Sequence, residues 1–328
     1  MTVANARRST TAVLVATLLA IATTAARAQD DVRFELSVMS FNINDLPAPL
    51  RSKSSSAMKI IGRDLARRAA DGTAPDVVLL QEAFTKRSKK LIREAGYPHV
   101  VKGPGPRVID EASRVIEYDS PTDREPGGPR RAYNRLTNSG LYILSRFPIE
   151  LLEKEVYGND CSGSDCLANK GIVYARIRIP GHRVPVDIAT THMDSNSKDA
   201  SRKARFSAHV QQTGTLLNFL DRMRGGRALI LAGDLNIRDD RRYDHFVLQA
   251  RALNAGTLCL GVGSGCAIDP DTPPQALTRD TNDYHFIFEG TDYRIEPVAM
   301  ARSYGEKMGG KRLSDHAAFE VTYRLTPK

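Results

Sequence analysis

The stretch Asp76-Val-Val-Leu-Leu-Gln-Glu82 holds four consecutive apolar residues and then changes at once to two polar side chains. A short apolar run of this kind is typical of a strand that is buried on both faces, as in α/β proteins. The stretch therefore predicts an interior strand. Its end places the carboxylate of Glu82 where a rigid sheet meets solvent, which suits an active-site group.

The same change from an apolar strand to polar side chains recurs at four other places along the chain. They are Phe41-Asn42, Thr191-His192, Gly233-Asp-Leu-Asn236 and Ser314-Asp-His316. Each of them taken alone has an ordinary structural explanation, such as a turn or a hydrogen-bonded surface residue. Together, these strand ends predict one site built along the edge of a sheet.

Hydrophobic periodicity divides the rest of the chain into alternating strands and helices. We expect helices at residues 57–69, 88–95 and 201–224, and strands at 34–41, 76–80, 141–144, 173–179, 186–190, 228–232, 286–288 and 319–325. This mixture predicts an α/β fold, a four-layer sandwich in which two packed mixed sheets are flanked by helices.

Some segments also carry a prediction about their surroundings. In residues 173–179 apolar and polar side chains alternate, so the face that carries Tyr174 is expected to lie in water. The stretches 102–137 and 254–280 are expected to be loops at the rim of the site. In the helix at 201–224, the inward stripe is predicted to consist of Phe206, Val210, Thr213, Leu217 and Leu220.

The first 28 residues have the order of a secretory signal peptide. Arg7 and Arg8 form a basic start, an apolar run follows, and Ala26-Arg27-Ala28 supplies a cleavage motif of small residues. The apolar run is shorter than the ~20 residues that a membrane-spanning helix needs. We expect cleavage near Ala28, which leaves residues 29–328 as a single catalytic domain in a secreted or periplasmic protein.

Basic residues exceed acidic ones over the whole chain, 47 to 38, for a formal charge of +9. An excess of six remains once the three arginines of residues 1–28 are removed. Such a balance suits an anionic substrate or an anionic surface. The excess is too small and too scattered to indicate nucleic-acid binding by itself.

The chain has four cysteines, and an even number in an exported protein predicts disulfides. Three pairings are open, and the short spacings favour Cys161–Cys166 and Cys259–Cys266. A zinc site is the competing interpretation. Neither pair has the spacing of a zinc motif and no histidine lies close by in the sequence, so we favour disulfides.

The polar strand ends supply the groups that hydrolysis of a phosphodiester requires. Mg²⁺ binds carboxylate and amide oxygens and offsets the charge of phosphate, and Glu82 and Asn42 offer such oxygens. A neutral histidine is a suitable base near pH 7 when a carboxylate orients it. Asp315, His316 and Asp283 offer these parts. The pattern predicts a Mg²⁺-assisted attack of water on phosphorus.

Seven segments in order along residues 34–325 resemble the endonuclease/exonuclease/phosphatase superfamily of DNase-type metal phosphoesterases. The resemblance implies a DNase-like sandwich with the site at one edge, and we expect a monomer. The segments are Met39-Ser-Phe-Asn-Ile43, Asp76-Val-Val-Leu-Leu-Gln-Glu82, Ser139-Gly-Leu-Tyr-Ile-Leu-Ser-Arg146, Thr191-His192, Gly233-Asp-Leu-Asn236, Asn282-Asp-Tyr284 and Ser314-Asp-His316.

The resemblance implies roles for the metal-binding and base-forming residues. Glu82 resembles the family's principal metal ligand, with Asn42 beside it. Asp315 resembles a residue that supports the metal region. His316 resembles the general base, and Asp283 the carboxylate that orients it.

Three further residues resemble those that handle water and phosphate in the family. Asp234 and Asn236 resemble the pair that positions the attacking water and the phosphate. His192 resembles the histidine that stabilises the transition state. The chain is thus expected to be an enzyme, a metal-dependent phosphoric diester hydrolase.

One local segment points to a substrate. Asp165 is followed by Leu167-Ala-Asn-Lys-Gly171, which resembles a segment of neutral and bacterial sphingomyelinases that also follows a cysteine. The resemblance implies that Asp165 lies in the site and that Lys170 contacts phosphate. The alternative is a plain turn that leads into a strand. The implied reaction is hydrolysis of sphingomyelin to ceramide and phosphocholine.

The chain departs from those sphingomyelinases in two ways. Asn138 stands where they carry an aspartate, and it is included here among the phosphate-binding candidates. Their aromatic hairpin for membrane entry is absent, since residues 291–313 offer only Tyr293 and Tyr304 and the chain has no Trp. Peripheral contact with a lipid surface would then depend on electrostatics, and a soluble phosphodiester stays open as the substrate.

Three alternatives stay open at this point. A DNase-like endonuclease is favoured by the basic clusters Lys86-Arg-Ser-Lys-Lys90 and Arg130-Arg131, which suit backbone phosphates. An inositol-phosphate phosphatase is less favoured because its extended signature after the final Asp-His is absent. A binding protein on an inactive enzyme fold would lack Glu82, Asp234 or His316, and all three are present.

Overall fold

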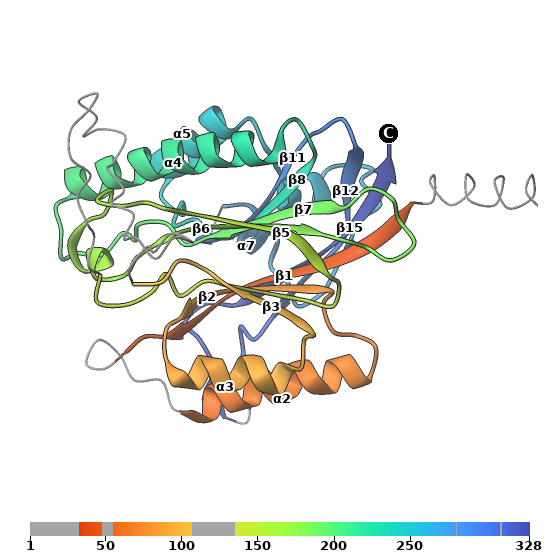
Figure 1. Cartoon of the computed structure of the whole chain (residues 1–328), viewed down its shortest axis with the longest axis horizontal. Coiled ribbons are helices and arrows are strands. Elements are labelled where there is room, and N and C mark those ends of the chain that lie inside the picture. The colour runs from red at the N-terminus through yellow and green to blue at the C-terminus, as the bar shows by residue number, and fades with distance from the viewer. Residues whose placement is uncertain (1–32, 48–54, 107–134, 280, 309) are drawn as a thin grey trace, which may run out of the picture.

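The computed structural model describes residues 33–47, 55–106, 135–279, 281–308 and 310–328. In this part of the chain, two β-sheets pack face to face and helices cover their outer faces (Figure 1). The predicted four-layer α/β sandwich of two mixed sheets is thus confirmed. The predicted signal peptide, residues 1–28, lies outside the described residues.

The first sheet has seven strands in the order β10-β12-β15-β1-β2-β4-β3. Its pairs are antiparallel except β1–β2 and β10–β12, which are parallel. The strands are β1 (Phe34–Asp45), β2 (Val77–Ala83), β3 (His99–Lys102), β4 (Tyr142–Ser145), β10 (Ala267–Ile268), β12 (Tyr293–Ser303) and β15 (Ala318–Pro327).

The second sheet has six strands in the order β5-β6-β7-β8-β11-β9. Only β7 and β8 are a parallel pair among these neighbours. The strands are β5 (Ile149–Val156), β6 (Gly171–Ile177), β7 (Val186–Thr191), β8 (Leu229–Asp234), β9 (Leu253–Asn254) and β11 (Asp283–Phe288). A separate hairpin, β13 (Lys307–Met308) with β14 (Lys311–Arg312), precedes β15.

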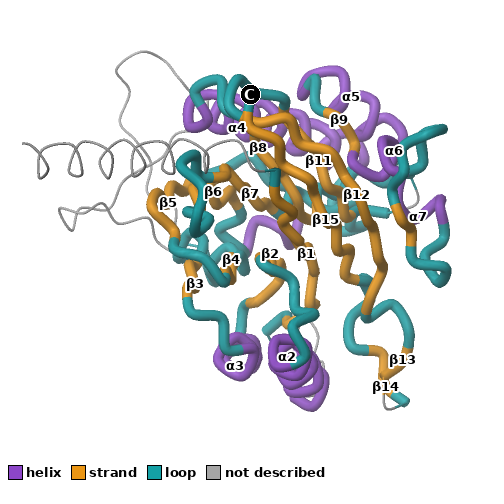
Figure 2. The backbone as a smooth tube through the Cα atoms, turned by 90° about the vertical axis from the view of Figure 1, so that its right-hand side faces the viewer, coloured by secondary structure: helices purple, strands orange, loops and turns teal. Residues whose placement is uncertain are grey.

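Two pairs of helices form the outer layers. Helices α2 (Ser55–Ala70) and α3 (Lys86–Ala95) lie side by side against the seven-stranded sheet (Figure 2). Helices α4 (Arg202–Arg224) and α5 (Asp240–Ala250) cover the six-stranded sheet. Short helices α6 (Ala255–Cys259) and α7 (Pro274–Thr278) lie at the β11–β12 side.

The side-chain alternation of the strands divides the interior into three cores. Leu36 and Val38 of β1 face the other sheet and join the core between the sheets. Phe41, with the opposite parity, packs in the layer that holds α2 and α3. Because a strand has a period of two, the inner face of β1 continues past Val38 to Ser40 and Asn42. The sandwich therefore directs Asn42 between the two sheets.

The connection from β7 to β8 fixes which end of the molecule carries the strand ends. β7 and β8 are parallel, and α4 is the crossover between them. The helix must run antiparallel to both strands, so its first turn lies at their carboxyl ends. His192 and Asp234 lie at those ends, and they form an isolated bridge.

Two predictions about buried faces are wrong, for the same reason. Tyr174 of β6 is fully buried rather than wet, because α4 covers the outer face of that strand. The inward residues of α4 are Ala208, His209, Gln212, Thr213, Leu216, Phe219 and Leu220. Of the predicted stripe, only Thr213 and Leu220 are therefore buried. Phe206 and Val210 remain partly exposed.

Both disulfides predicted from the short spacings are present, Cys161–Cys166 and Cys259–Cys266. The first closes a loop around a 3₁₀ turn, Gly163–Leu167, that carries Asp165. The second closes the loop after α6. The cysteines are thus used for cross-links and leave the predicted metal chemistry to other residues.

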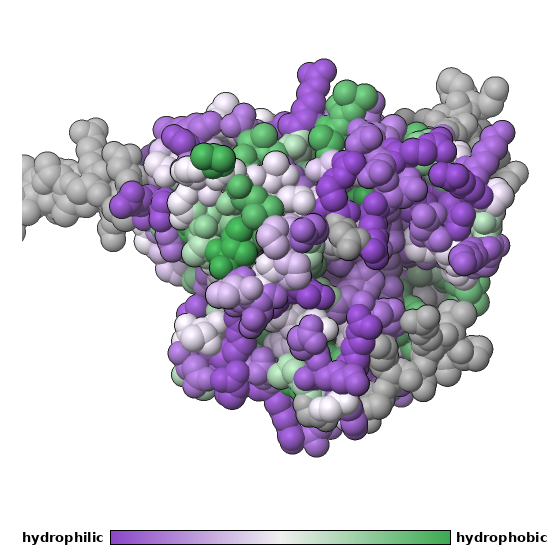
Figure 3. Space-filling view, turned by 180° about the vertical axis from the view of Figure 1, so that it is seen from behind, coloured by the Kyte–Doolittle hydropathy of each residue, from purple (hydrophilic) through white to green (hydrophobic). Residues whose placement is uncertain are grey.

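The surface seen from behind is mainly hydrophilic, with a hydrophobic group left of centre (Figure 3). In the described ranges, no helix has the length and apolar character that crossing a bilayer would require. Large apolar side chains with high exposure among the described residues include Leu248, at 73 %, and Val262 at the tip of the second disulfide loop.

Candidate active site

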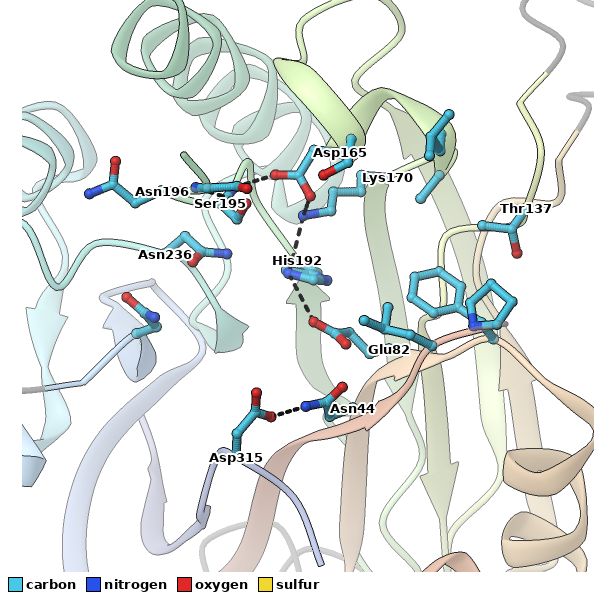
Figure 4. Close-up of a pocket in the computed structure, with 18 residues that line it drawn as sticks. Asn44, Glu82, Thr137, Asp165, Lys170, His192, Ser195, Asn196, Asn236 and Asp315 are labelled. Carbon is cyan, nitrogen blue, oxygen red and sulfur yellow. Dashed lines mark hydrogen bonds and ion pairs between the residues drawn. The ribbon is translucent and has the colours of Figure 1, made fainter. Parts of the chain in front are cut away.

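A cleft of about 590 Å³ opens where the predicted strand ends meet. It lies between the two sheets, so residues far apart in sequence face one another across it (Figure 4). Asn42 and Asp234 adjoin this cleft, because Asn42 donates to Glu82 and Oδ2 of Asp234 lies 3.5 Å from Nε2 of His192. Asp283 and His316 directly follow the lining residues Asn282 and Asp315 in the sequence. Predicted site residues that line it directly are Glu82, Asp165, Lys170, His192, Asn236 and Asp315.

Glu82 reaches the cleft only because the backbone leaves the strand pattern at this residue. Val78 and Leu80 point into the outer core, and simple alternation would send Glu82 the same way. Instead Glu82 has a φ of 54°, in the left-handed region that non-glycine residues rarely adopt. Asn44 and Asn236, which also line the cleft, have φ values of 48° and 53°. Such strain is common at functional sites.

Asn42 joins two carboxylates that come from different sheets. Its Nδ2 donates to Oε1 of Glu82 at 3.0 Å and to Oδ2 of Asp234 at 2.8 Å. Its carbonyl Oδ1 accepts from the backbone N–H of Asn44 at 3.0 Å. The amide therefore holds the acidic pair together, and a ligand role for Asn42 itself stays a prediction.

Burial disfavours the charged forms of these two carboxylates. It raises the pKa of Glu82, against the lowering effect of the hydrogen bond from Asn42. Burial, with the nearby charge of Asp283, raises the pKa of Asp234 to about 7. A pair of desolvated acids in a cleft is a common feature of functional sites.

His316 lies beside this acidic pair and is oriented by Asp283. Its Nδ1 is 2.7 Å from Oδ2 of Asp283, and its Nε2 is 3.8 Å from Oδ2 of Asp234. Burial opposes the charged imidazole, but the carboxylates of Asp283 and Asp234 outweigh it and raise the pKa of His316 to about 11. The carboxylates thus hold a proton on His316.

His192, Lys170 and Asp165 form a second connected group on the far side of Glu82 (Figure 4). The Lys170 ammonium is 2.8 Å from Oδ1 of Asp165 and 3.2 Å from Nε2 of His192, and it donates to the carbonyl of Met193 at 2.9 Å. Burial, followed by the charge of Lys170, lowers the pKa of His192 well below its usual value. His192 is therefore neutral.

The remaining predicted residues have simpler surroundings. Asn236 donates to the carbonyl of Met193 at 3.0 Å, and Asp315 accepts a hydrogen bond from Asn44. Asn138 does not line the cleft, and its side-chain oxygen accepts from the N–H of Gly140 at 2.8 Å. A contact between Asn138 and phosphate stays a prediction.

Of the two stretches expected at the rim, one is wrong and one lies mostly outside the described residues. Residues 254–279 do not line the cleft; their apolar side chains pack into the core between the sheets. For the stretch 102–137, residues 107–134 are not described, and Thr137 lines the cleft.

Sequence reasoning missed the buried pair that supports the floor of the cleft. Asp194 accepts hydrogen bonds from the N–H and hydroxyl of Ser162, which ties it to the first disulfide loop. Arg242 is only 2 % exposed. It donates to the carbonyls of Asp194 at 2.6 Å and Asn236 at 3.1 Å. No local pattern marks Arg242, because its partners are main-chain atoms of distant loops.

We expect Arg242→Met to destabilise the protein and to lower its activity. Each buried carbonyl left without a donor costs ~1–3 kcal/mol, so the loss is about 4 kcal/mol and Tm falls by about 10 °C. Differential scanning fluorimetry measures this shift. Arg63→Met, at an exposed position of α2, is the control and keeps the wild-type Tm. An unchanged Tm in Arg242→Met would refute its supporting role.

The acidic groups of the site have the spacing of a possible metal-binding cluster. Glu82, His192 and Asp234 offer atoms within 4.8 Å of one another, as do Asp234, Asp283 and His316. Oε2 of Glu82 is buried and has no hydrogen-bond partner in the described part of the chain. By contrast, Nε2 of His192 faces the Lys170 ammonium. Oxygen atoms of the acidic pair therefore suit a hard cation such as Mg²⁺.

The fold and the site define a class of protein. Residues 39–294 match the model of the Endonuclease/Exonuclease/phosphatase family, so the chain belongs to that family. A sphingomyelinase of Mycobacterium tuberculosis is 28 % identical over 197 residues, which are 57 % of this chain and 37 % of the relative. The chain thus spans about a third of the length of this curated relative.

Solved structures share the fold at lower sequence identity. Beta toxin from Staphylococcus aureus, in a mutant form with bound magnesium ions, aligns with a TM-score of 0.59 and 17 % identity, covering 90 % of this chain and 100 % of the toxin. Sphingomyelinase C from Streptomyces griseocarneus aligns with a TM-score of 0.57 and 20 % identity, over 88 % and 99 % of the two chains. These likenesses agree with the two-sheet sandwich.

Proposed function

We propose that this protein is a secreted, Mg²⁺-dependent phosphodiesterase that hydrolyses sphingomyelin to ceramide and phosphocholine. The observation that carries the proposal is the convergence of Glu82, Asp234 and the His316–Asp283 pair beside one cleft. Family membership and the names of the relatives support the reaction class and the lipid substrate. Export follows from the predicted signal peptide at residues 1–28.

We assign metal binding to the acidic side of the cleft. Glu82 is the principal ligand, because one of its oxygens has no other partner in the described chain. Asp315, held by Asn44, and Asn42 complete the surroundings of the ion. When bound, Mg²⁺ would offset the charge of the phosphodiester and stabilise the leaving oxygen.

His316 is the general base in this proposal. A cation bound at the acidic side of the cleft would offset the charge of Glu82 and Asp234 and so make the imidazole lose its proton more readily. Asp283 keeps Nδ1 fixed. Nε2 then takes a proton from water. The water oxygen forms a bond to phosphorus, the bond from phosphorus to the ceramide oxygen breaks, and that oxygen takes up a proton.

The other polar residues position the phosphate. Lys170, held by Asp165, keeps a positive charge at the cleft next to the neutral His192. Asn236 lines the cleft and contacts Asp234, because its backbone N–H donates to Oδ1 of Asp234 at 3.1 Å. These donors suit the charge that develops on phosphate oxygens in the transition state.

A lipid substrate is favoured by the apolar part of the cleft lining. Leu46, Pro47, Phe84, Leu167 and Ala168 line it together with the polar groups. They are partly exposed, so they present an apolar surface next to the acidic pair. A nucleic acid would bring sugars and phosphates to this surface instead, which it suits less well.

Turnover of sphingomyelin by the mature chain, residues 29–328, tests the proposal. We expect phosphocholine release in Mg²⁺ and its loss in EDTA, with restoration on adding Mg²⁺ back. Parallel assays use plasmid DNA and phosphoinositides under the same conditions. Nicking of DNA without release of phosphocholine would contradict the proposed hydrolysis of sphingomyelin and favour the nuclease alternative.

A further inference from the structure

A second hollow, of about 560 Å³, lies at the start of α4. Its lining consists of Arg202, Lys203, Phe206, Ser207, Val210 and Arg241. The first five belong to the first turns of α4, and Arg241 belongs to α5. This hollow shares no residue with the cleft.

The lining combines an apolar floor with a cationic rim. Phe206 and Val210, which the sequence predicted to face the core, are partly exposed here. The guanidinium of Arg241 lies over the Phe206 ring, 4.5 Å from its centroid. Arg202 and Lys203 are exposed, and none of the described residues that line the hollow is acidic. The chemistry suits an anionic group that is attached to an apolar body.

The acidic residues of α5 do not neutralise this rim. Asp240 and Asp244 lie close in sequence to Arg241, but their carboxylates pair with Arg279 at 2.7 and 3.3 Å. Among the described residues, no acidic side chain forms an ion pair with Arg202, Lys203 or Arg241, so these charges are open to a partner. Three cations on one small surface are a substantial part of the net charge that remains after residues 1–28.

The hollow lies at the same end of the molecule as the cleft. α4 starts at the carboxyl ends of β7 and β8 (Figure 1). His192 and Asp234 lie at those strand ends. Arg205, one turn into the helix, donates to the carbonyl of Asn196 at 2.9 Å and to that of Ser197. Both of these residues line the cleft. A ligand in the hollow would therefore sit next to the cleft.

We propose that this hollow binds the headgroup of an anionic phospholipid and so holds the cleft at a bilayer surface. Its role rests on the proposed lipid substrate, which requires contact with a bilayer, and residues 291–313 offer only Tyr293 and Tyr304 as aromatic anchors. Basic side chains near an anionic bilayer each strengthen binding. Neutralising all three is expected to weaken binding to anionic vesicles about 100-fold.

Vesicle sedimentation tests this proposal with no substrate present. The mature wild type, a triple variant (R202Q, K203Q and R241Q) and a control triple (K59Q, R63Q and R93Q) are mixed with phosphatidylcholine vesicles, with or without phosphatidylserine. The control removes the same charge from exposed positions of α2 and α3, in the opposite outer layer. We expect the wild type and the control to bind only the phosphatidylserine vesicles, and high salt to release them.

Two further measurements separate this proposal from the proposed function. Sphingomyelin in neutral detergent micelles is expected to be hydrolysed equally by all three proteins. If the wild type did not hydrolyse sphingomyelin in these micelles, the phosphodiesterase assignment would be refuted. The result of the vesicle experiment would not be affected. If the triple variant of the hollow (R202Q, K203Q and R241Q) binds the vesicles as well as the wild type does, the proposed headgroup site is refuted. The proposed headgroup site is also refuted if the protein binds a DNA fragment and not the vesicles, and if only this triple variant loses the binding of DNA.

Discussion

We expect His316→Ala to lower the turnover number for sphingomyelin by about 10³-fold and to leave the overall fold unchanged. A positioned general base typically contributes ~10²–10⁴-fold, and His316 is the only histidine in the described chain that the structure pairs with Asp283. Its imidazole is partly exposed beside the cleft, so removing it leaves no large cavity. Phosphocholine release under saturating substrate measures the effect.

A matched histidine outside the cleft provides the control. His182 packs against Phe34, with ring centroids 4.0 Å apart. Phe34 is the first residue of β1, so His182 lies at the opposite end of the sheet from the cleft. His182→Ala keeps the wild-type turnover number. Activity of His316→Ala within a factor of about three of the wild type would remove His316 from the mechanism and leave the site without its proposed base.

We expect Glu82→Gln to abolish the proposed stabilisation of the protein by Mg²⁺ and to lower turnover by about 10³-fold. The loss of a metal-held transition-state charge is worth several kcal/mol, and ~4 kcal/mol corresponds to this factor. In EDTA the variant is at least as stable as the wild type, because burial already disfavours the charged form of Glu82.

Thermal unfolding with and without Mg²⁺ separates binding from catalysis. A ligand at 100 times its Kd stabilises a native protein by ~2.7 kcal/mol, which raises the Tm of the wild type by several degrees. Glu306→Gln, at an exposed position directly before β13, is expected to retain this shift. An equal Mg²⁺-induced rise in Tm for Glu82→Gln would place the ion elsewhere.

The sequence was a good guide to where strands end and a poor guide to what covers them. Runs such as 76–82 and 228–234 locate interior strands and their polar tips, because apolar content and an abrupt change are local properties. The faces of β6 and α4 were misjudged. Periodicity says which residues share a face, whereas packing of another element decides whether that face is buried.

The candidate site shows the same division. Short motifs identified Glu82, Asp234 and His316, and the short cysteine spacings identified both disulfides. Short motifs could not predict that the Asn42 amide bridges two carboxylates, or that the buried guanidinium of Arg242 supports the site. The partners of both side chains come from separate segments of the chain.

What the sequence by itself determined is the set of strands, the polar residues at their ends and the family to which the chain belongs. Only the tertiary structure decided how those residues face one another. The reversal of the backbone at Glu82 turns its carboxylate away from the outer core, and the packing of two sheets brings Asp234 to meet it. The local sequence gives the chemical type of each side chain. The distances between these side chains and their removal from water arise only when remote segments fold together.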